Sequence, residues 1–272
     1  MIAVETKQPV TLGEISRYFD GYSDPWKRPY VEKLESWYEY RPIKLREDYA
    51  IDLISDEPRG IAIDLGCGIG HALIRMKQLG FDRVIGVDVS PIMLAEADRL
   101  LKTEKMSTSI ELYHGDVRDL KLVSSGSVDV CTALGVIEYH PEDAPMLREV
   151  NRILKLNGAA VLQTRNFYCL NSRTWWVIEQ LFPRYRRRIA YREHRPAVFR
   201  ASLEQFGFRV ERECFSAYFA LYPLTAIPLV RRAVGPLNNF VSKQCERFRH
   251  KGFSTLLAAT YMVKVRKIAE LS

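Results

Sequence analysis

Residues 64–70 read Asp-Leu-Gly-Cys-Gly-Ile-Gly and stand between an apolar run at 60–65 and a helical pattern at 70–79. Glycine at alternate positions suits a tight turn and lets a ligand approach the backbone closely. The turn also opens a helix N-terminus, whose free N–H groups favour anionic or polar ligand groups. The stretch therefore predicts a strand, a ligand-binding turn and a helix, in that order.

Short apolar runs alternate with helical patterns along the rest of the chain. Strands are predicted at 60–65, 83–88, 109–114, 128–134, 158–164, 208–216 and 256–265. Helices are predicted at 70–79, 90–101, 141–156 and 196–206. Because strands that alternate with helices form βαβ units, we expect an α/β fold. The expected architecture is Rossmann-like: a doubly wound, seven-stranded, mostly parallel sheet with an α-helical cap rich in aromatic and basic residues.

Composition divides the 272 residues into three parts. Residues 1–50 are rich in aromatic side chains and predict an N-terminal helical lid. Residues 51–165 hold the regular alternation and predict the ligand-binding core. Residues 166–272 predict the remainder of the core with two cap inserts, at about 166–195 and 217–254.

The overall composition, 47% hydrophobic and 27% charged, is typical of a soluble globular protein. Apolar runs fall short of the roughly 20 residues that a membrane-spanning helix needs, and the N-terminus lacks an apolar signal core. Five dispersed cysteines without a CxxC pair suit a reducing compartment. We therefore expect a cytoplasmic protein and no metal site.

The glycine loop admits two ligand classes. The dinucleotide-binding motif is GxGxxG, but His71 occupies the position of its third glycine in this chain. Asp88, at the end of the next predicted strand, could accept ribose hydroxyls in either class. A nicotinamide-dependent oxidoreductase is therefore the less favoured alternative, and a non-catalytic interaction protein is another.

Four further segments accompany the loop in order. Residues 84–90 read Val-Ile-Gly-Val-Asp-Val-Ser, 115–117 Gly-Asp-Val, 128–138 Val-Asp-Val-Cys-Thr-Ala-Leu-Gly-Val-Ile-Glu, and 147–158 Leu-Arg-Glu-Val-Asn-Arg-Ile-Leu-Lys-Leu-Asn-Gly. With these segments the chain resembles the class I S-adenosylmethionine-dependent methyltransferases. It resembles the branch that methylates small molecules, including quinones, lipids and carrier-bound acyl chains.

The resemblance implies a set of residues that bind S-adenosyl-L-methionine. Asp64 would meet its ammonium group, and Asp88 would accept both ribose hydroxyls. Met93 would lie against the adenine ring, and Asp116 would accept from the adenine amino group. The implied cofactor set is Asp64, Gly66, Cys67, Gly68, Gly70, Asp88, Val89, Met93, Asp116, Val117 and Leu134.

The acceptor side is less defined. A base is needed only for acceptors such as a phenol, a hydroxyl or an acidic carbon. His140 is the candidate base, beside Glu138 and Tyr139, and the alternative is a plain loop histidine. The family often has histidine where Tyr139 stands. The expected substrate-pocket residues are Tyr18, Tyr22, Tyr139, Asn166 and His194.

The net charge of +7 is unevenly distributed. Residues 1–164 carry −6, with 20 Lys/Arg and 26 Asp/Glu, whereas residues 165–272 carry +13, with 20 and 7. Residues 237–251 predict a basic amphipathic helix, a pattern of membrane surfaces and of acidic partners. A cap that packs its apolar face on the sheet would give the same pattern.

The sequence therefore predicts methyl transfer to a lipophilic or lipid-linked small-molecule acceptor, on oxygen, nitrogen or carbon. The protein could work at an anionic membrane surface. Nucleic acid is disfavoured, because residues 134–137 read Leu-Gly-Val-Ile where base-amino methyltransferases carry Asp/Asn-Pro-Pro-Tyr/Phe. An RNA, protein or carrier-bound substrate is the alternative, and no oligomeric state is predicted.

Overall fold

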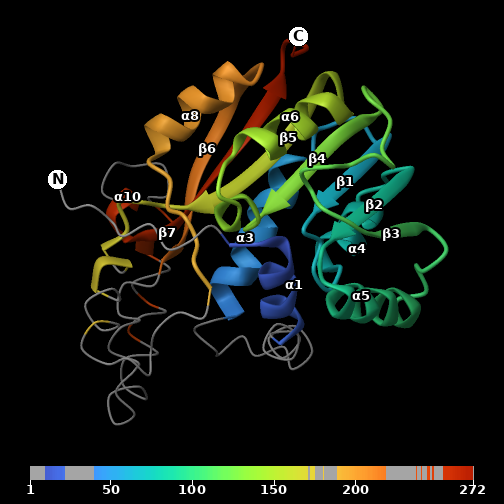
Figure 1. Cartoon of the computed structure of the whole chain (residues 1–272), viewed down its shortest axis with the longest axis horizontal. Coiled ribbons are helices and arrows are strands. Elements are labelled where there is room, and N and C mark those ends of the chain that lie inside the picture. Colours follow the sequence, from blue (N-terminus) through green and yellow to red (C-terminus); the bar gives the residue numbers. More distant parts are fainter. Residues whose placement is uncertain are drawn as a thin grey trace.

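The computed structural model describes residues 10–21, 40–170, 172–174, 189–218 and 254–271, with the single residues 180, 237, 240, 244, 245 and 247. In this part of the chain seven strands form one sheet, in the order β3-β2-β1-β4-β5-β7-β6 (Figure 1). The strands are β1 Ile61–Leu65, β2 Arg83–Asp88, β3 Ile110–His114, β4 Val128–Leu134, β5 Leu154–Arg165, β6 Phe208–Tyr218 and β7 Ala258–Lys267.

Strands β1 to β5 are parallel to one another, whereas β7 runs antiparallel to its two neighbours. β1 pairs in parallel with β2 and β4, β2 with β3, and β4 with β5. β7 lies antiparallel between β5 and β6. The strand order reverses at β1, so a crevice is expected outside the carboxyl ends of β1 and β4. The predicted Rossmann-like, mostly parallel seven-stranded sheet is confirmed.

Helices cover both faces of the sheet (Figure 1). The helical elements are α1 Leu12–Asp20, α3 Tyr40–Leu53, α4 His71–Gln78, α5 Pro91–Thr103, the 3-10 turn η1 Ile137–Tyr139, α6 Ala144–Ile153, α8 Pro196–Gln205 and α10 Ser254–Leu257. Side chains of α3, α4 and α5 pack on one face, and side chains of α6 and α8 pack on the other. Neighbouring strand residues serve opposite cores: Ala62 faces the first group and Ile63 the second.

The junction between α6 and β5 differs from the prediction. The helix was expected at 141–156 and the strand at 158–164, but α6 ends at Ile153 and β5 begins at Leu154. Leu154 takes an extended backbone conformation and pairs with Val128. Leu156, which continues the helical spacing in the sequence, is an exposed strand residue. Pairing with β4 therefore overrides the local helical pattern.

Most of the two cap inserts lies outside the described residues, and of the predicted basic helix at 237–251 only residues 237, 240, 244, 245 and 247 are described. The described piece at 189–195 runs past the end of β5, where the His194 N–H donates to the Arg165 carbonyl at 2.8 Å. None of the helices described is long and apolar enough to span a membrane.

Candidate functional site

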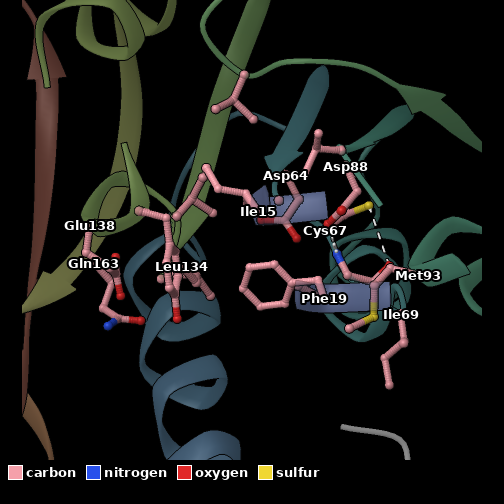
Figure 2. A pocket seen from close by; sticks show the side chains of 18 of the residues that line it. Ile15, Phe19, Asp64, Cys67, Ile69, Asp88, Met93, Leu134, Glu138 and Gln163 are labelled. Atoms are coloured by element: carbon pink, nitrogen blue, oxygen red, sulfur yellow. Dashed lines mark hydrogen bonds between the residues drawn. The ribbon is translucent and has the colours of Figure 1, made fainter. Parts of the chain in front are cut away.

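A cavity of about 320 Å³ opens at the carboxyl ends of the central strands. Residues that end or follow β1, β2, β4 and β5 form its floor, and side chains of α1 and α3 form the opposite wall. Figure 2 shows Phe19 and Ile15 of α1 facing the loop that follows β1. The cavity therefore occupies the crevice that the strand order predicts.

The three glycines at positions 66, 68 and 70 have different structural roles. Gly66 has a φ of +72°, and a Cβ there would lie 2.3 Å from Val136 Cγ2. Gly68 has a φ of +52° and open space where its Cβ would stand, on the cavity wall. Gly70 begins α4 with a φ of +85°, and its Cβ would meet Ala97 of α5 at 3.2 Å. Gly70 thus serves helix packing and is not part of the cavity wall.

Asp88, at the end of β2, fixes the glycine loop. Its Oδ2 accepts from the Gly68 N–H and its Oδ1 from the Ser90 N–H, both at 2.8 Å. The Val89 backbone N–H also interacts with this carboxylate. Burial raises the pKa of this carboxyl above its usual range, and the backbone hydrogen bonds oppose the shift. Asp88 therefore shapes the loop and, on the cavity wall, offers carboxylate oxygens to ligand hydroxyls.

Asp64, at the end of β1, is a buried acid on the cavity floor. It is 4% exposed, and Thr132 Oγ1 donates to its Oδ1 at 2.5 Å. The pKa of Asp64 is raised to about 7: burial raises it most, Glu47 raises it as well, and the Thr132 hydrogen bond and Arg46 lower it. Glu47 and Arg46 both line the cavity from α3. Carboxylates beside a guanidinium suit a ligand that carries an ammonium and a carboxylate, such as an amino-acid zwitterion.

The remaining cofactor candidates also reach the cavity. Met93 holds its place because its N–H donates to Ser90 Oγ at 3.0 Å. The Asp116 carboxylate already accepts a hydrogen bond within the protein, because Arg118 Nη2 donates to its Oδ2 at 2.7 Å. Burial raises the pKa of Asp116, but the hydrogen bonds from Arg118 outweigh burial and lower it. The other members on the wall are Cys67, Val89, Val117 and Leu134.

The turn η1 brings His140 and Tyr139 to the cavity. Burial lowers the pKa of His140 to about 4, so its imidazole is neutral near pH 7. The Tyr139 ring meets the Phe19 ring edge-on, with centroids 5.3 Å apart. Tyr18 packs on Phe19 at 5.1 Å but is not part of the wall. Tyr22 lies outside the described residues.

Asn166 and His194 were expected in the substrate pocket, and the structure places both away from the cavity wall. Asn166 is fully buried and donates to the carbonyls of Thr255 and Ala258. His194 Nδ1 lies 2.5 Å from Thr164 Oγ1, and its Nε2 lies 3.0 Å from Asp143 Oδ1. The His194 contacts tie residues 189–195 to β5 and to the start of α6, and the Asn166 contacts tie the end of β5 to α10 and β7.

The wall also contains polar residues that the sequence did not single out as site residues. Gln163 and Arg165 reach it from β5, and Arg46 from α3. Arg165 Nε lies 3.8 Å from Glu138 Oε1, and its guanidinium stacks on the Tyr191 ring at 4.5 Å. Gln163 and Arg165 could have been predicted as wall residues from their spacing, because residues two apart share one face of a strand and β5 leads to the crevice.

Comparison with known proteins agrees with this geometry. The family model described as a methyltransferase domain matches residues 63–162. A demethylmenaquinone methyltransferase of Lactobacillus johnsonii is 29% identical over 165 residues, covering 54% of this chain and 67% of that protein. A ubiquinone biosynthesis O-methyltransferase of Acinetobacter baumannii is 27% identical over 132 residues, covering 47% of this chain and 55% of that protein.

The same architecture occurs in a solved structure. Magnesium protoporphyrin IX methyltransferase from Synechocystis, with bound SAH, has a TM-score of 0.63 at 17% identity and covers 94% of this chain and 99% of that one. At this identity the likeness shows the fold alone. The chain spans about half to two thirds of the two curated relatives above. Residues 63–162 therefore match the methyltransferase domain family, within a sheet that has the Rossmann-like methyltransferase fold.

Proposed function

We propose that this protein transfers a methyl group from S-adenosylmethionine to a lipophilic or lipid-linked small molecule. The proposal is supported chiefly by one observation: a single cavity is lined both by the carboxylates of Asp64 and Asp88 and by apolar and aromatic side chains. A donor and an acceptor bound at its two ends would lie next to each other, which is what an in-line displacement requires.

The chain's residues fit the proposed cofactor. Asp64 would pair with the ammonium group, and Arg46 would face the carboxylate. Asp88 would accept the ribose hydroxyls, and Met93 would pack on the adenine ring. The cofactor supplies an activated methyl group on a sulfonium, so the protein's task is to bind, orient and exclude water.

The acceptor end favours a lipophilic molecule. Leu12, Ile15 and Phe19 of α1, Val136 after β4 and Ala217 of β6 present apolar surface to the cavity. The two relatives named for menaquinone and ubiquinone methylation support this choice. A radiolabelled methyl donor incubated with the protein and a cell extract is expected to leave label in the organic phase. Label confined to RNA or to protein would contradict the proposal and favour the alternative substrates.

Association with an anionic membrane surface is a further part of the proposal, supported by the +13 charge of residues 165–272. Each basic residue near an anionic surface contributes roughly 1 kcal/mol, and salt screens this attraction. We expect the protein to co-sediment with vesicles containing phosphatidylserine at low salt and to be released at high salt. Neutral phosphatidylcholine vesicles are the control. Equal recovery with both vesicle types would contradict membrane association.

Cofactor binding is expected to depend on pH through Asp64. Burial is the main reason that its pKa is raised to about 7. The ionised form pairs with the ammonium group, so affinity is full above pH 7 and falls by up to about tenfold per pH unit below it. Calorimetric titration between about pH 5.5 and 8 measures the slope. Asp64→Asn should bind weakly with a flatter profile, and equal slopes in the two proteins would refute the assignment to Asp64.

A further inference from the structure

Polar atoms without a partner gather on the wall of the cavity. Glu138 Oε2, Gln163 Oε1 and His140 Nδ1 are buried and have no hydrogen-bond partner among the described residues. Glu138 is 2% exposed and Gln163 is 1% exposed. A buried polar group left without a partner is costly, so native structures place such atoms where a ligand or ordered water satisfies them. The cavity wall is therefore built to receive a polar group.

Two of these side chains converge on one spot. Gln163 lies beside Leu134 in the β4–β5 ladder, and Gly135 follows with a φ of +77°. A Cβ on Gly135 would lie 3.0 Å from Arg46 Nη1, 3.6 Å from Glu138 Oε1 and 3.7 Å from Gln163 Oε1, so a guanidinium shares this spot with the two acceptors. Figure 2 shows Glu138 and Gln163 next to each other, across the cavity from Asp88 and Met93, with Leu134 and Asp64 between them.

Both atoms are acceptors, which defines the missing partner. An ionised carboxylate only accepts hydrogen bonds, and an amide oxygen also only accepts. The group that satisfies Glu138 Oε2 must therefore donate an O–H or an N–H. Asp64 and Asp88 account for the donors expected on the cofactor, and Figure 2 shows Asp88 across the cavity from Glu138. A donor group on the acceptor, in place of ordered water, would therefore meet Glu138 Oε2.

The backbone around Glu138 is held in place by Arg192, which is not part of the cavity wall. The Arg192 N–H donates to the Glu138 carbonyl at 2.7 Å, and Arg192 Nε donates to the His140 carbonyl at 2.6 Å. Arg165 and Arg46, both on the cavity wall, supply positive charge near the carboxylate. Burial raises the pKa of Glu138, and Arg165 opposes the shift. A fixed, buried carboxyl of raised basicity is suited to take a proton from a weak acid.

We propose that Glu138 accepts the proton of a hydroxyl or amino group on the acceptor, so that methylation takes place on oxygen or nitrogen. The inference rests on the proposed function. The acceptor's O–H or N–H bond breaks and its proton goes to Glu138 Oε2, while that oxygen or nitrogen bonds to the methyl carbon. The carbon–sulfur bond of the donor breaks, and its electron pair stays on sulfur, which loses its positive charge. Gln163 orients the same acceptor group.

The first test needs no variant. Wild-type protein is incubated with carbon-13-methyl S-adenosylmethionine and a lipid extract, and the labelled product is examined by NMR. The carbon shift separates a methyl ether or methylamine from a methyl group bonded to carbon or sulfur. The inference expects an oxygen- or nitrogen-bound methyl. A carbon- or sulfur-bound methyl overturns it and leaves the methyltransferase proposal standing, whereas no transfer at all removes both.

The second test concerns Glu138 itself. Glu138→Gln keeps the shape and removes the basic carboxylate, so kcat should fall at least about a hundredfold, as for loss of a general base. Cofactor affinity by calorimetry should stay within about twofold, which also shows that the site is folded. Glu142→Gln, at an exposed position four residues on, is the matched control and should leave kcat unchanged.

A further variant, Glu138→Asp, keeps the proposal testable if Glu138→Gln fails to fold. If Glu138→Gln no longer binds the cofactor, Glu138→Asp retains a carboxylate on a shorter side chain and should keep measurable, reduced transfer. An unchanged kcat in Glu138→Gln would overturn the inference. The same holds for Glu138→Asp with intact cofactor binding and no transfer.

Discussion

Asp88→Ala is expected to weaken S-adenosylmethionine binding at least a hundredfold. The carboxylate holds the glycine loop through the Gly68 N–H and α5 through the Ser90 N–H, each at 2.8 Å. In the proposed complex it also accepts two ribose hydroxyls. Hydrogen bonds to a charged group contribute roughly 1.5–3 kcal/mol each, and about 1.4 kcal/mol is tenfold in affinity. Loss of the two ribose contacts alone accounts for the expected effect.

Calorimetric titration measures this affinity. Asp98→Ala is the matched control, because Asp98 lies on α5 with an exposed side chain that pairs with Lys102. Its affinity should equal that of the wild type. Asp88→Asn keeps one acceptor oxygen and should fall between the two. An Asp88→Ala affinity within threefold of wild type would remove Asp88 from the site.

Gly66→Ala is expected to lower the free energy of unfolding by about 2–5 kcal/mol and to abolish cofactor binding. A left-handed backbone costs a non-glycine residue roughly 1–2 kcal/mol, and Gly66 has a φ of +72°. The new Cβ would also stand 2.3 Å from Val136 Cγ2, and overpacking typically costs 1–3 kcal/mol. Urea unfolding measures the sum.

Two variants separate these costs. Gly126→Ala meets the same backbone strain, with a φ of +59°, but has nothing within 4 Å of the new Cβ. It should lose only the smaller, backbone part. The double variant Gly66→Ala, Val136→Ala removes the clash and should recover part of the stability that Gly66→Ala loses, net of the cost of Val136→Ala alone. Equal losses in Gly66→Ala and Gly126→Ala would contradict the close approach of Val136.

The sheet and the cofactor side could be predicted because their signals are local. Strands β1, β2 and β4 are short apolar runs, and each candidate there stands at or just beyond a strand end. Asp64 and Asp88 follow this rule and lie on the cavity wall. Gly70 fits the same glycine-loop pattern. The sequence pattern cannot show, however, that the position of a Cβ on Gly70 faces Ala97 of α5 and not a ligand.

The acceptor side could not be predicted in the same way, because it depends on which face of a strand each residue occupies. Gln163 and Arg165 of β5 point to the cavity, whereas Thr164 and Asn166, one position away, point to His194 and to α10. A one-residue step reverses the face. The sequence analysis named Asn166 and missed its neighbours. Arg46 reaches the same wall from α3 through tertiary packing that leaves no local pattern.

We expect the cavity at the carboxyl ends of β1, β2 and β4 to bind S-adenosylmethionine. The decisive measurement is titration calorimetry of the full chain with S-adenosylmethionine, and separately with NAD. We expect saturable one-to-one binding of S-adenosylmethionine, weakened at least a hundredfold by Asp88→Ala, and no heat of binding with NAD. No binding of S-adenosylmethionine by folded protein, or binding of NAD that depends on Asp88, would contradict it.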